Sequence, residues 1–260
     1  MAYVFAYMLL GALLVALIAA NEMFGLFSSD SFSATWKRIA AYFWLAAFLF
    51  LITTLIIGAA QEKVTKTALR DVSFWSLFTL HILLLIFLLG WWLLSGRPPI
   101  RRFMNLLPQD PLRSIAVGIA VGVGGWAITI TLAAMIGLLL TAFHLMPKDL
   151  APSPMIPWMA ALPLWKKAVI VFTAMTVEEA FFRGFLQKRV GLVLSTMAFG
   201  IAHAGYGQPI LLVGVTIVSV VIGYTFYRTK NLVPCIIAHG VFDGIQLFII
   251  VPLAVKFAGI

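Results

Sequence analysis

Charged residues are scarce in this chain, and acidic residues are the scarcest. Only 10% of the 260 residues are charged, Asp and Glu together number nine, and 63% are hydrophobic. Soluble domains carry about a quarter charged residues, so this composition excludes a soluble globular fold. The chain instead has long apolar runs, and about 20 mostly apolar residues cross a bilayer as a helix. We therefore predict an all-α fold, a polytopic transmembrane helical bundle.

Cysteine is also nearly absent, and the start of the chain lacks basic residues. Cys235 is the single cysteine, so an internal disulfide is excluded and the redox compartment is not indicated. Residues 1–20 contain no Lys or Arg, which excludes the basic n-region of a signal peptide. The first apolar run is therefore predicted to be a retained membrane helix.

The apolar runs predict about eight spans, of which the fourth is too long for one straight crossing and must tilt, kink or project from the membrane. Within it, Gly118 and Gly122 are spaced to let another helix approach closely. The predicted spans are residues 3–27, 39–60, 73–95, 114–146, 166–187, 191–207, 209–227 and 232–256.

One segment divides the chain. Residues 151–163 contain four prolines and no charge, which predicts a loop or interfacial segment. We accordingly expect N-terminal transmembrane helices in residues 1–150 and a second helical bundle in residues 151–260, together forming one integral membrane unit.

The net charge of +9 does not indicate nucleic-acid binding, because Lys and Arg gather at the ends of the predicted spans. The loops after spans one, three, five and seven hold more of them than the opposite loops do. The positive-inside rule therefore places those loops on the cytoplasmic side. The expected surroundings are the lipid bilayer, with no nucleic acid as partner.

Against this apolar background, six charged or histidine residues lie inside predicted spans of the C-terminal half, away from the span ends. A central Asp or Arg costs roughly 2.5–3.5 kcal/mol on insertion scales, so such residues are rare and point to function. The cost falls if they face one another or a wet cavity, so we expect them to converge between the C-terminal helices. They are Glu178, Glu179, Arg183, His203, His239 and Asp243.

Helical spacing separates the two adjacent glutamates. Glu179 and Arg183 are four residues apart, which predicts an ion pair on one face of the helix. Glu178 is turned about 100° away and is left to face a cavity. His239 and Asp243 are likewise four apart and share a face.

Other candidate residues have a simpler interpretation. A single membrane histidine most often bonds to a neighbouring helix, and this is the role expected of His81 and His144. Cys235 lies one turn before His239, but a free cysteine is usually a small buried hydrophobe. We therefore expect no Cys-His nucleophile.

Three motifs resemble those of a known family. "EEAFFR" fits EExxxR, "FGIAH" fits FxxxH with Phe199 and His203, and "HGVFD" fits HxxxN/D. Their order on apolar helices resembles the CPBP intramembrane proteases, which include type II CAAX prenyl endopeptidases and bacteriocin-processing or immunity (Abi) proteins. The resemblance covers roughly residues 166–252, and the N-terminal half has no matching motif.

The resemblance implies an intramembrane endopeptidase that hydrolyses a peptide bond with water activated by Glu178. His203 would position the water, His239 would donate to the oxyanion, and Asp243 would complete the site. These residues would be held in position by Glu179, Arg183 and Phe199. Peptide hydrolysis needs such a base and such donors in any case.

Asp243 stands where the prenyl proteases have Asn, which leaves three alternatives. An ionised Asp cannot donate to an oxyanion, so Asp243 is protonated, orients His239, or ligates a metal. In the last case Glu178, His203, His239 and Asp243 would hold zinc with a position open for water. HExxH is absent. We favour catalysis without a metal or other cofactor, and zinc is the alternative.

Two other functions use the same residue types. Buried Glu, His, Asp and Arg also build proton relays, so a proton-coupled membrane transporter is one alternative. A non-catalytic immunity protein is the other. For the protease, the expected substrate is a membrane-associated protein or peptide, and the options are a prenylated protein, a leader peptide or a pheromone. We expect a multi-pass protein of a prokaryotic cell membrane with its active site toward the cytoplasmic half.

Overall fold

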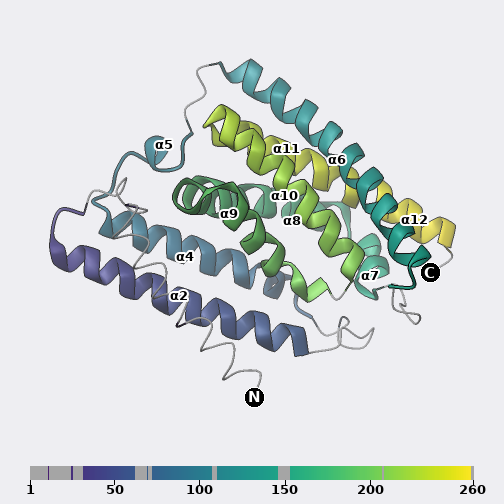
Figure 1. Cartoon of the computed structure of the whole chain (residues 1–260), viewed down its shortest axis with the longest axis horizontal. Coiled ribbons are helices and arrows are strands. Elements are labelled where there is room, and N and C mark those ends of the chain that lie inside the picture. Colours follow the sequence, from purple (N-terminus) through teal and green to yellow (C-terminus); the bar gives the residue numbers. More distant parts are fainter. Residues whose placement is uncertain are drawn as a thin grey trace.

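The computed structural model describes residues 11, 25, 32–61, 69, 72–106, 110–145, 153–206 and 208–258. Every regular element in these ranges is a helix, as the sequence predicts (Figure 1). The predicted span at residues 3–27 lies outside the described residues, apart from Gly11 and Gly25.

The described N-terminal part contains three long helices. The longest of them, α6, begins with Pro111 in its first turn, and the Asp110 side chain caps it by accepting from Arg113 N at 3.0 Å. The elements are α2 (Thr35–Gln61), η1 (Phe74–Phe78), α4 (Thr79–Leu94), α5 (Ile100–Phe103) and α6 (Pro111–Ala142).

The C-terminal part is built from more, mostly shorter, elements. Asn231 caps α11 by accepting from Val233 N at 3.0 Å. The elements are α7 (Met155–Ala161), α8 (Leu164–Thr173), η2 (Ala174–Glu178), η3 (Ala180–Gln187), α9 (Lys188–Ala202), η4 (Ala204–Tyr206), α10 (Pro209–Thr229), α11 (Leu232–Ile245), η5 (Gln246–Ile250) and α12 (Val251–Ala258).

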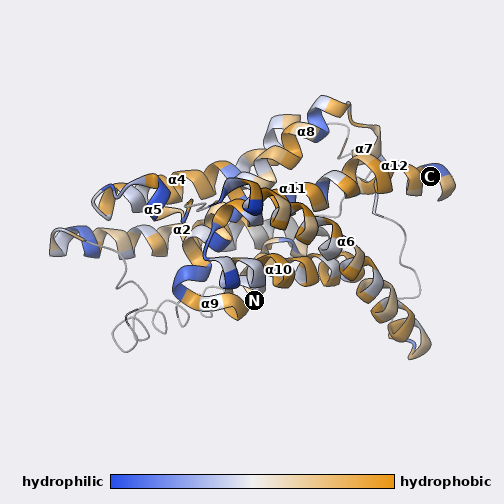
Figure 2. Cartoon of the chain, turned by 90° about the horizontal axis from the view of Figure 1, so that it is seen from above, coloured by the Kyte–Doolittle hydropathy of each residue, from blue (hydrophilic) through white to orange (hydrophobic). Residues whose placement is uncertain are grey.

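Five described helices are long and apolar enough to cross a membrane, or six if the bent pair α7 plus Leu164–Ala202 counts as one span. Figure 2 shows how far apolar residues dominate these ribbons. This agrees with a polytopic bundle. At about 1.5 Å per residue, the 32-residue α6 is about 48 Å long and exceeds a hydrocarbon core of about 30 Å. The single spans are Thr35–Leu55, Phe74–Leu94, Pro111–Ala142, Pro209–Thr229 and Leu232–Phe257.

The expected loop at residues 151–163 is only partly a loop. Residues 155–161 form the short helix α7, which meets the next helix at 116°. Pro154 precedes it, and Pro163 precedes α8, so each helix starts where proline is tolerated. The sharp bend lets α7 pack against α12.

The predicted spans at residues 166–187 and 191–207 are two helical arms joined by a reversal. Gly191 has φ 80° and ψ 178°, a backbone conformation that favours glycine. A continuous helix would separate Phe182 and Phe199 by about 25 Å. Their ring centroids are instead 4.8 Å apart, so α9 folds back onto η3. The second arm ends at Ala202 rather than at 207.

Two glycines of α6 allow α11 to pack directly on its backbone, as the small-residue spacing predicts. A Cβ atom at Gly118 would lie 2.6 Å from Ile237 Cβ, and one at Gly122 would lie 2.6 Å from Val241 Cβ. Val241 lies between His239 and Asp243, so this contact sets the position of the site helix.

We expect Gly122→Val to lower both stability and activity. Its side chain would collide with Val241 and with the Ala238 carbonyl, and overpacking costs about 1–3 kcal/mol. Thermal unfolding of the purified protein measures the effect. Gly124→Val is the matched control, because a Cβ at Gly124 meets nothing within 4 Å. Equal stability of the two variants would contradict the close packing of α6 on α11.

An aromatic core joins the two halves of the chain. Phe87 and Trp91 of α4 contact Phe185 of η3, with ring centroids 5.1 and 5.2 Å apart. Phe87 also lies 5.8 Å from Phe181. These rings are almost completely buried, so α4 is fixed against η2 and η3.

Candidate active site

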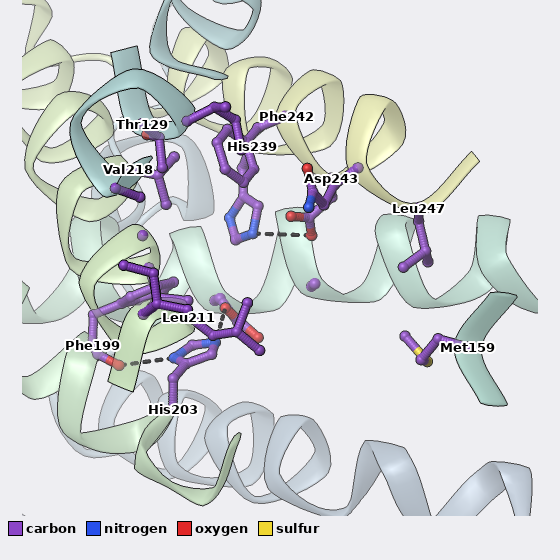
Figure 3. Close-up of a pocket in the computed structure, with 18 of the residues that line it drawn as sticks. Thr129, Met159, Phe199, His203, Leu211, Val218, His239, Phe242, Asp243 and Leu247 are labelled. Atoms are coloured by element: carbon purple, nitrogen blue, oxygen red, sulfur yellow. Dashed lines mark hydrogen bonds and ion pairs between the residues drawn. The ribbon is translucent and has the colours of Figure 1, made fainter. Parts of the chain in front are cut away.

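A cavity of about 580 Å³ lies between α6, α10, α11 and η2. Aliphatic and aromatic side chains form most of its wall, and the ionisable residues on it are two acids and three histidines. Figure 3 shows His239 and Asp243 on one side and His203 with Phe199 on the other. The polar lining residues are His81, Thr129, Glu178, His203, His239, Asp243 and Gln246.

Glu178 reaches the cavity from a π-helical segment. The wide turns of η2 and η3 flank Glu179, and such segments occur frequently at functional sites. Glu178 Oε1 lies 3.0 Å from His81 Nε2. Its other oxygen, Oε2, makes no hydrogen bond within the described residues and lies 3.8 Å from His203 Nε2. One carboxylate oxygen is thus held, and the other is available for chemistry.

Glu179 points away from the cavity, as the helical spacing predicts. Its Oε1 accepts from Arg183 Nη1 at 3.0 Å, and both residues are almost completely buried. Arg183 Nη2 also donates to the carbonyl and the hydroxyl of Ser219 on α10, at 3.1 and 3.0 Å. The Arg183 guanidinium lies 4.7 Å from the ring centre of Phe199. The pair therefore ties η3 to α9 and α10 behind the cavity.

His239 links this buried pair to the cavity. Its Nδ1 lies 2.7 Å from Glu179 Oε1, and its Nε2 lies 3.3 Å from Asp243 Oδ2. Ionised carboxylates only accept, so both contacts are hydrogen bonds only if the ring is doubly protonated or one acid carries a proton. Glu179 and Asp243 together fix the orientation of the imidazole.

Asp243 contacts His239 at the wall of the cavity. Its carboxylate lies beside the ring of His239, with 29% of the side chain exposed to the cavity. In this position Asp243 can accept a hydrogen bond from His239 Nε2, which is the contact that the orienting alternative requires. Nearby, Trp126 Nε1 donates to Gln246 Oε1 at 3.0 Å, which holds the Gln246 amide at the cavity wall.

His203 is held by its own helix end. It follows the last residue of α9, and its Nδ1 lies 2.8 Å from the Phe199 carbonyl oxygen. A carbonyl only accepts, so Nδ1 carries a hydrogen and a neutral ring has its lone pair on Nε2. The rings of Phe199 and His203 are stacked at 4.4 Å. Nε2 is thereby directed toward Glu178.

The four residues proposed as zinc ligands line the same cavity but do not form a ligand set. Within the described ranges, no group of three or more His, Cys, Asp or Glu side chains is arranged to hold a metal ion. In this arrangement, Glu178 Oε1 contacts His81 Nε2, and His239 Nε2 contacts Asp243 Oδ2, so these atoms already have partners within the protein. The residues present do not fit zinc as they are arranged here, and no step through a metal is derived below.

From the sequence, His81 was expected only to bond to a neighbouring helix. In the structure it contacts Glu178 and lines the cavity. His81 belongs to α4, in the half of the chain without a recognised motif. Gln246 was also missed. Both are polar residues inside predicted spans, and this was the one sequence feature that could have indicated a place in the site. Many polar residues that only pack between membrane helices share this feature.

Of the two remaining candidates, Cys235 lies where the sequence suggests and His144 does not. Cys235 is completely buried, and its Sγ lies 3.6 Å from the Asn231 carbonyl oxygen and 3.7 Å from that of Ile222. This is the environment of a small buried hydrophobe. His144 was expected to bond to a neighbouring helix, but α6 ends before it, and His144 is exposed and does not line the cavity.

Comparison with known proteins identifies one relationship. Residues 159–245 match the family model of the type II CAAX prenyl endopeptidase Rce1-like proteins. The match includes Glu178, Glu179, Arg183, His203, His239 and Asp243. No curated protein and no solved structure matches the chain. The family resemblance seen in the three motifs is therefore confirmed, and the N-terminal helices lie outside the matched region.

Proposed function

We propose that this chain, whose residues 159–245 belong to the Rce1-like family of CAAX-type proteases, is an intramembrane endopeptidase acting on a membrane-associated protein or peptide. The observation that carries the proposal is the Glu178 carboxylate. One of its oxygens is held by His81, and the other lies beside His203 in a largely apolar cavity.

Glu178 is the proposed general base. A water between Glu178 Oε2 and His203 Nε2 would donate one hydrogen to each, because both positions are acceptors. Glu178 takes a proton as the water oxygen attacks the peptide carbonyl carbon. When the C–N bond breaks, the same carboxyl returns that proton to the leaving amine. Atoms balance without a cofactor.

His239 is the proposed donor to the oxyanion. Its Nε2 faces the cavity beside Asp243, and its Nδ1 is held by the buried Glu179. Because Nε2 carries a single hydrogen, donation to the oxyanion requires that this hydrogen leave Asp243 or be shared with it. Glu179 and Arg183 thus act through His239, and Phe199 acts through His203 by accepting from Nδ1.

The cavity suits an apolar segment of substrate. Its volume lies in the range typical of ligand sites, about 300–1,000 Å³. Glycine, alanine and branched aliphatic residues of α6 and α10 line one wall, namely Ile130, Ala133, Ala134, Gly137, Ile210, Leu211, Gly214 and Val215. A membrane-associated peptide fits this lining, and a prenylated protein is one candidate within that class. We further propose that the site lies toward the cytoplasmic half of a prokaryotic cell membrane.

The function is tested by mapping new peptide termini. Membranes carrying wild-type protein or Glu178→Gln would be compared by mass spectrometry, with a farnesylated CAAX peptide and its unmodified form added in separate samples. Termini that appear only with Glu178 intact would support proteolysis. Cleavage of the farnesylated peptide alone would assign a prenylated substrate. Absence of any Glu178-dependent terminus would refute the proposed activity.

Replacement of Asp243 tests how the site works without a metal. Asparagine keeps an oxygen that accepts from His239 Nε2 and adds an amide donor facing the cavity. We expect Asp243→Asn to keep cleavage within a few-fold of wild type or to raise it, and chelators to have little effect. Cleavage rate and bound metal would be measured for both proteins.

The zinc alternative predicts the opposite result. Amide oxygen is a poorer zinc ligand than carboxylate, so metal content and cleavage would fall together in Asp243→Asn. Asp243→Leu is the control for the orienting role, because leucine removes the contact with His239 and should slow cleavage. Stoichiometric zinc that is lost together with activity in Asp243→Asn would overturn metal-free catalysis.

A further inference from the structure

We infer that His81 is a positioning residue of the active site, so that the N-terminal half of the chain completes the catalytic centre. This inference rests on the proposed role of Glu178 as the base. His81 comes from α4, outside the family-matched residues 159–245. Its Nε2 lies 3.0 Å from Glu178 Oε1 across a sequence separation of 97 residues.

The chemistry of the contact gives His81 its role. An ionised carboxylate only accepts, so His81 donates through Nε2–H. Rotation of the Glu178 side chain would turn the plane of its carboxylate away from His203. The bond from His81 to Oε1 holds that plane and keeps the second oxygen, Oε2, directed at His203 Nε2, which lies 3.8 Å away. His81 therefore fixes the direction in which the free side of the carboxylate faces the water.

The surroundings of His81 make its position rigid. It lies on the face of α4 that also carries the buried Leu84, Leu88 and Trp91. Farther along α4, Phe87 and Trp91 contact the aromatic rings of η3, so α4 and the segment that carries Glu178 are held side by side. Only 15% of the His81 side chain and 10% of the Glu178 side chain are exposed, so water competes poorly for this bond.

Packing alone does not require this histidine. A residue that only fills space would be replaced by leucine without loss, whereas a donor would not. Glutamine places an amide N–H near the position of histidine Nε2 and thus restores the donor without the ring. Leucine and glutamine at position 81 therefore separate the two roles.

The activity test compares four proteins in membranes by the rate at which Glu178-dependent peptide termini appear. We expect His81→Leu to be about 10- to 100-fold slower than wild type, because small misplacement of a catalytic group costs about 10²-fold. We expect His81→Gln to recover to within a few-fold of wild type. His144→Gln is the matched control and should equal wild type, since His144 is exposed and outside the cavity.

A spectroscopic test does not depend on the substrate. The carboxylate band lost on Glu178→Gln identifies Glu178 in infrared difference spectra of the purified protein. His81→Leu should shift this band, and His81→Gln should return it toward its wild-type position. If wild type produces no Glu178-dependent termini, the proposed protease fails, while the band shift still decides whether His81 holds Glu178.

Three results would overturn the inference. One is a His81→Leu protein that cleaves as fast as wild type. Another is an unshifted carboxylate band in the folded His81→Leu protein. The third is equal loss of activity in His81→Leu and His81→Gln when both are folded, because the donor would then not be the feature that matters.

Discussion

Glu178→Gln is expected to remove peptide cleavage while leaving the protein folded. Removal of a general base slows a reaction by about 10²- to 10⁴-fold, and the Glu178 carboxylate has an oxygen 3.8 Å from His203 Nε2. Glutamine has nearly the same shape, and its amide oxygen still accepts from His81 Nε2. The fold should persist because Glu178 contributes one hydrogen bond, whereas the aromatic core beneath it is unchanged.

The measurement is the rate of appearance of new peptide termini, together with thermal unfolding of both proteins. Asp110→Asn is a matched control, because it makes the same carboxylate-to-amide change at the cap of α6, where Asn caps as well as Asp. It should keep full activity. Full cleavage by folded Glu178→Gln would exclude the general-base role, and an unfolded variant would show that Glu178 is structural.

Arg183→Ala is expected to cause the largest loss of stability among single changes at the site. Arg183 is 1% exposed and Glu179 is completely buried, so removal of one partner leaves a buried charge with less compensation. Such changes cost about 3–5 kcal/mol. The Arg183 bonds to Ser219 and its contact with Phe199 are lost at the same time.

The double variant Glu179→Ala with Arg183→Ala is expected to be more stable than Arg183→Ala alone. Removing both partners eliminates the uncompensated charge, although His239 then loses its contact at Nδ1. Unfolding free energies of the wild type, both single variants and the double variant form a double-mutant cycle. A coupling free energy near zero would show that Glu179 and Arg183 do not stabilise each other.

Local periodicity was sufficient to separate the two glutamates. The four-residue spacing of Glu179 and Arg183 predicts a pair, and the rotation of about 100° per residue predicts that Glu178 faces elsewhere. The structure shows this arrangement, with only Glu178 lining the cavity. The cost of isolated charges in a membrane likewise predicts that His203, His239 and Asp243 converge on it.

The helix boundaries and the number of membrane spans were harder to predict from the sequence. Apolar composition does not distinguish a straight span from a bent one, so the 116° bend before Leu164 and the helix within residues 151–163 were not predicted. The π-helical segments around Glu178 and at Gln246 were not predicted either. A wider turn depends on where neighbouring helices press on the backbone, and the sequence carries no simple signal for that. The domain boundary at residue 150 remains a prediction.

The sequence by itself determined the membrane class, the apolar helices and the family motifs, because these follow from composition and from spacing within one helix. Only the tertiary structure decided which carboxylates His81 and His239 contact. His81 reaches Glu178 across 97 residues, and His239 joins Glu179 to Asp243. Such contacts depend on how α4, η2 and α11 pack against one another. The physical reason is that periodicity fixes the face a side chain occupies, whereas the packing of separate helices fixes what that face meets.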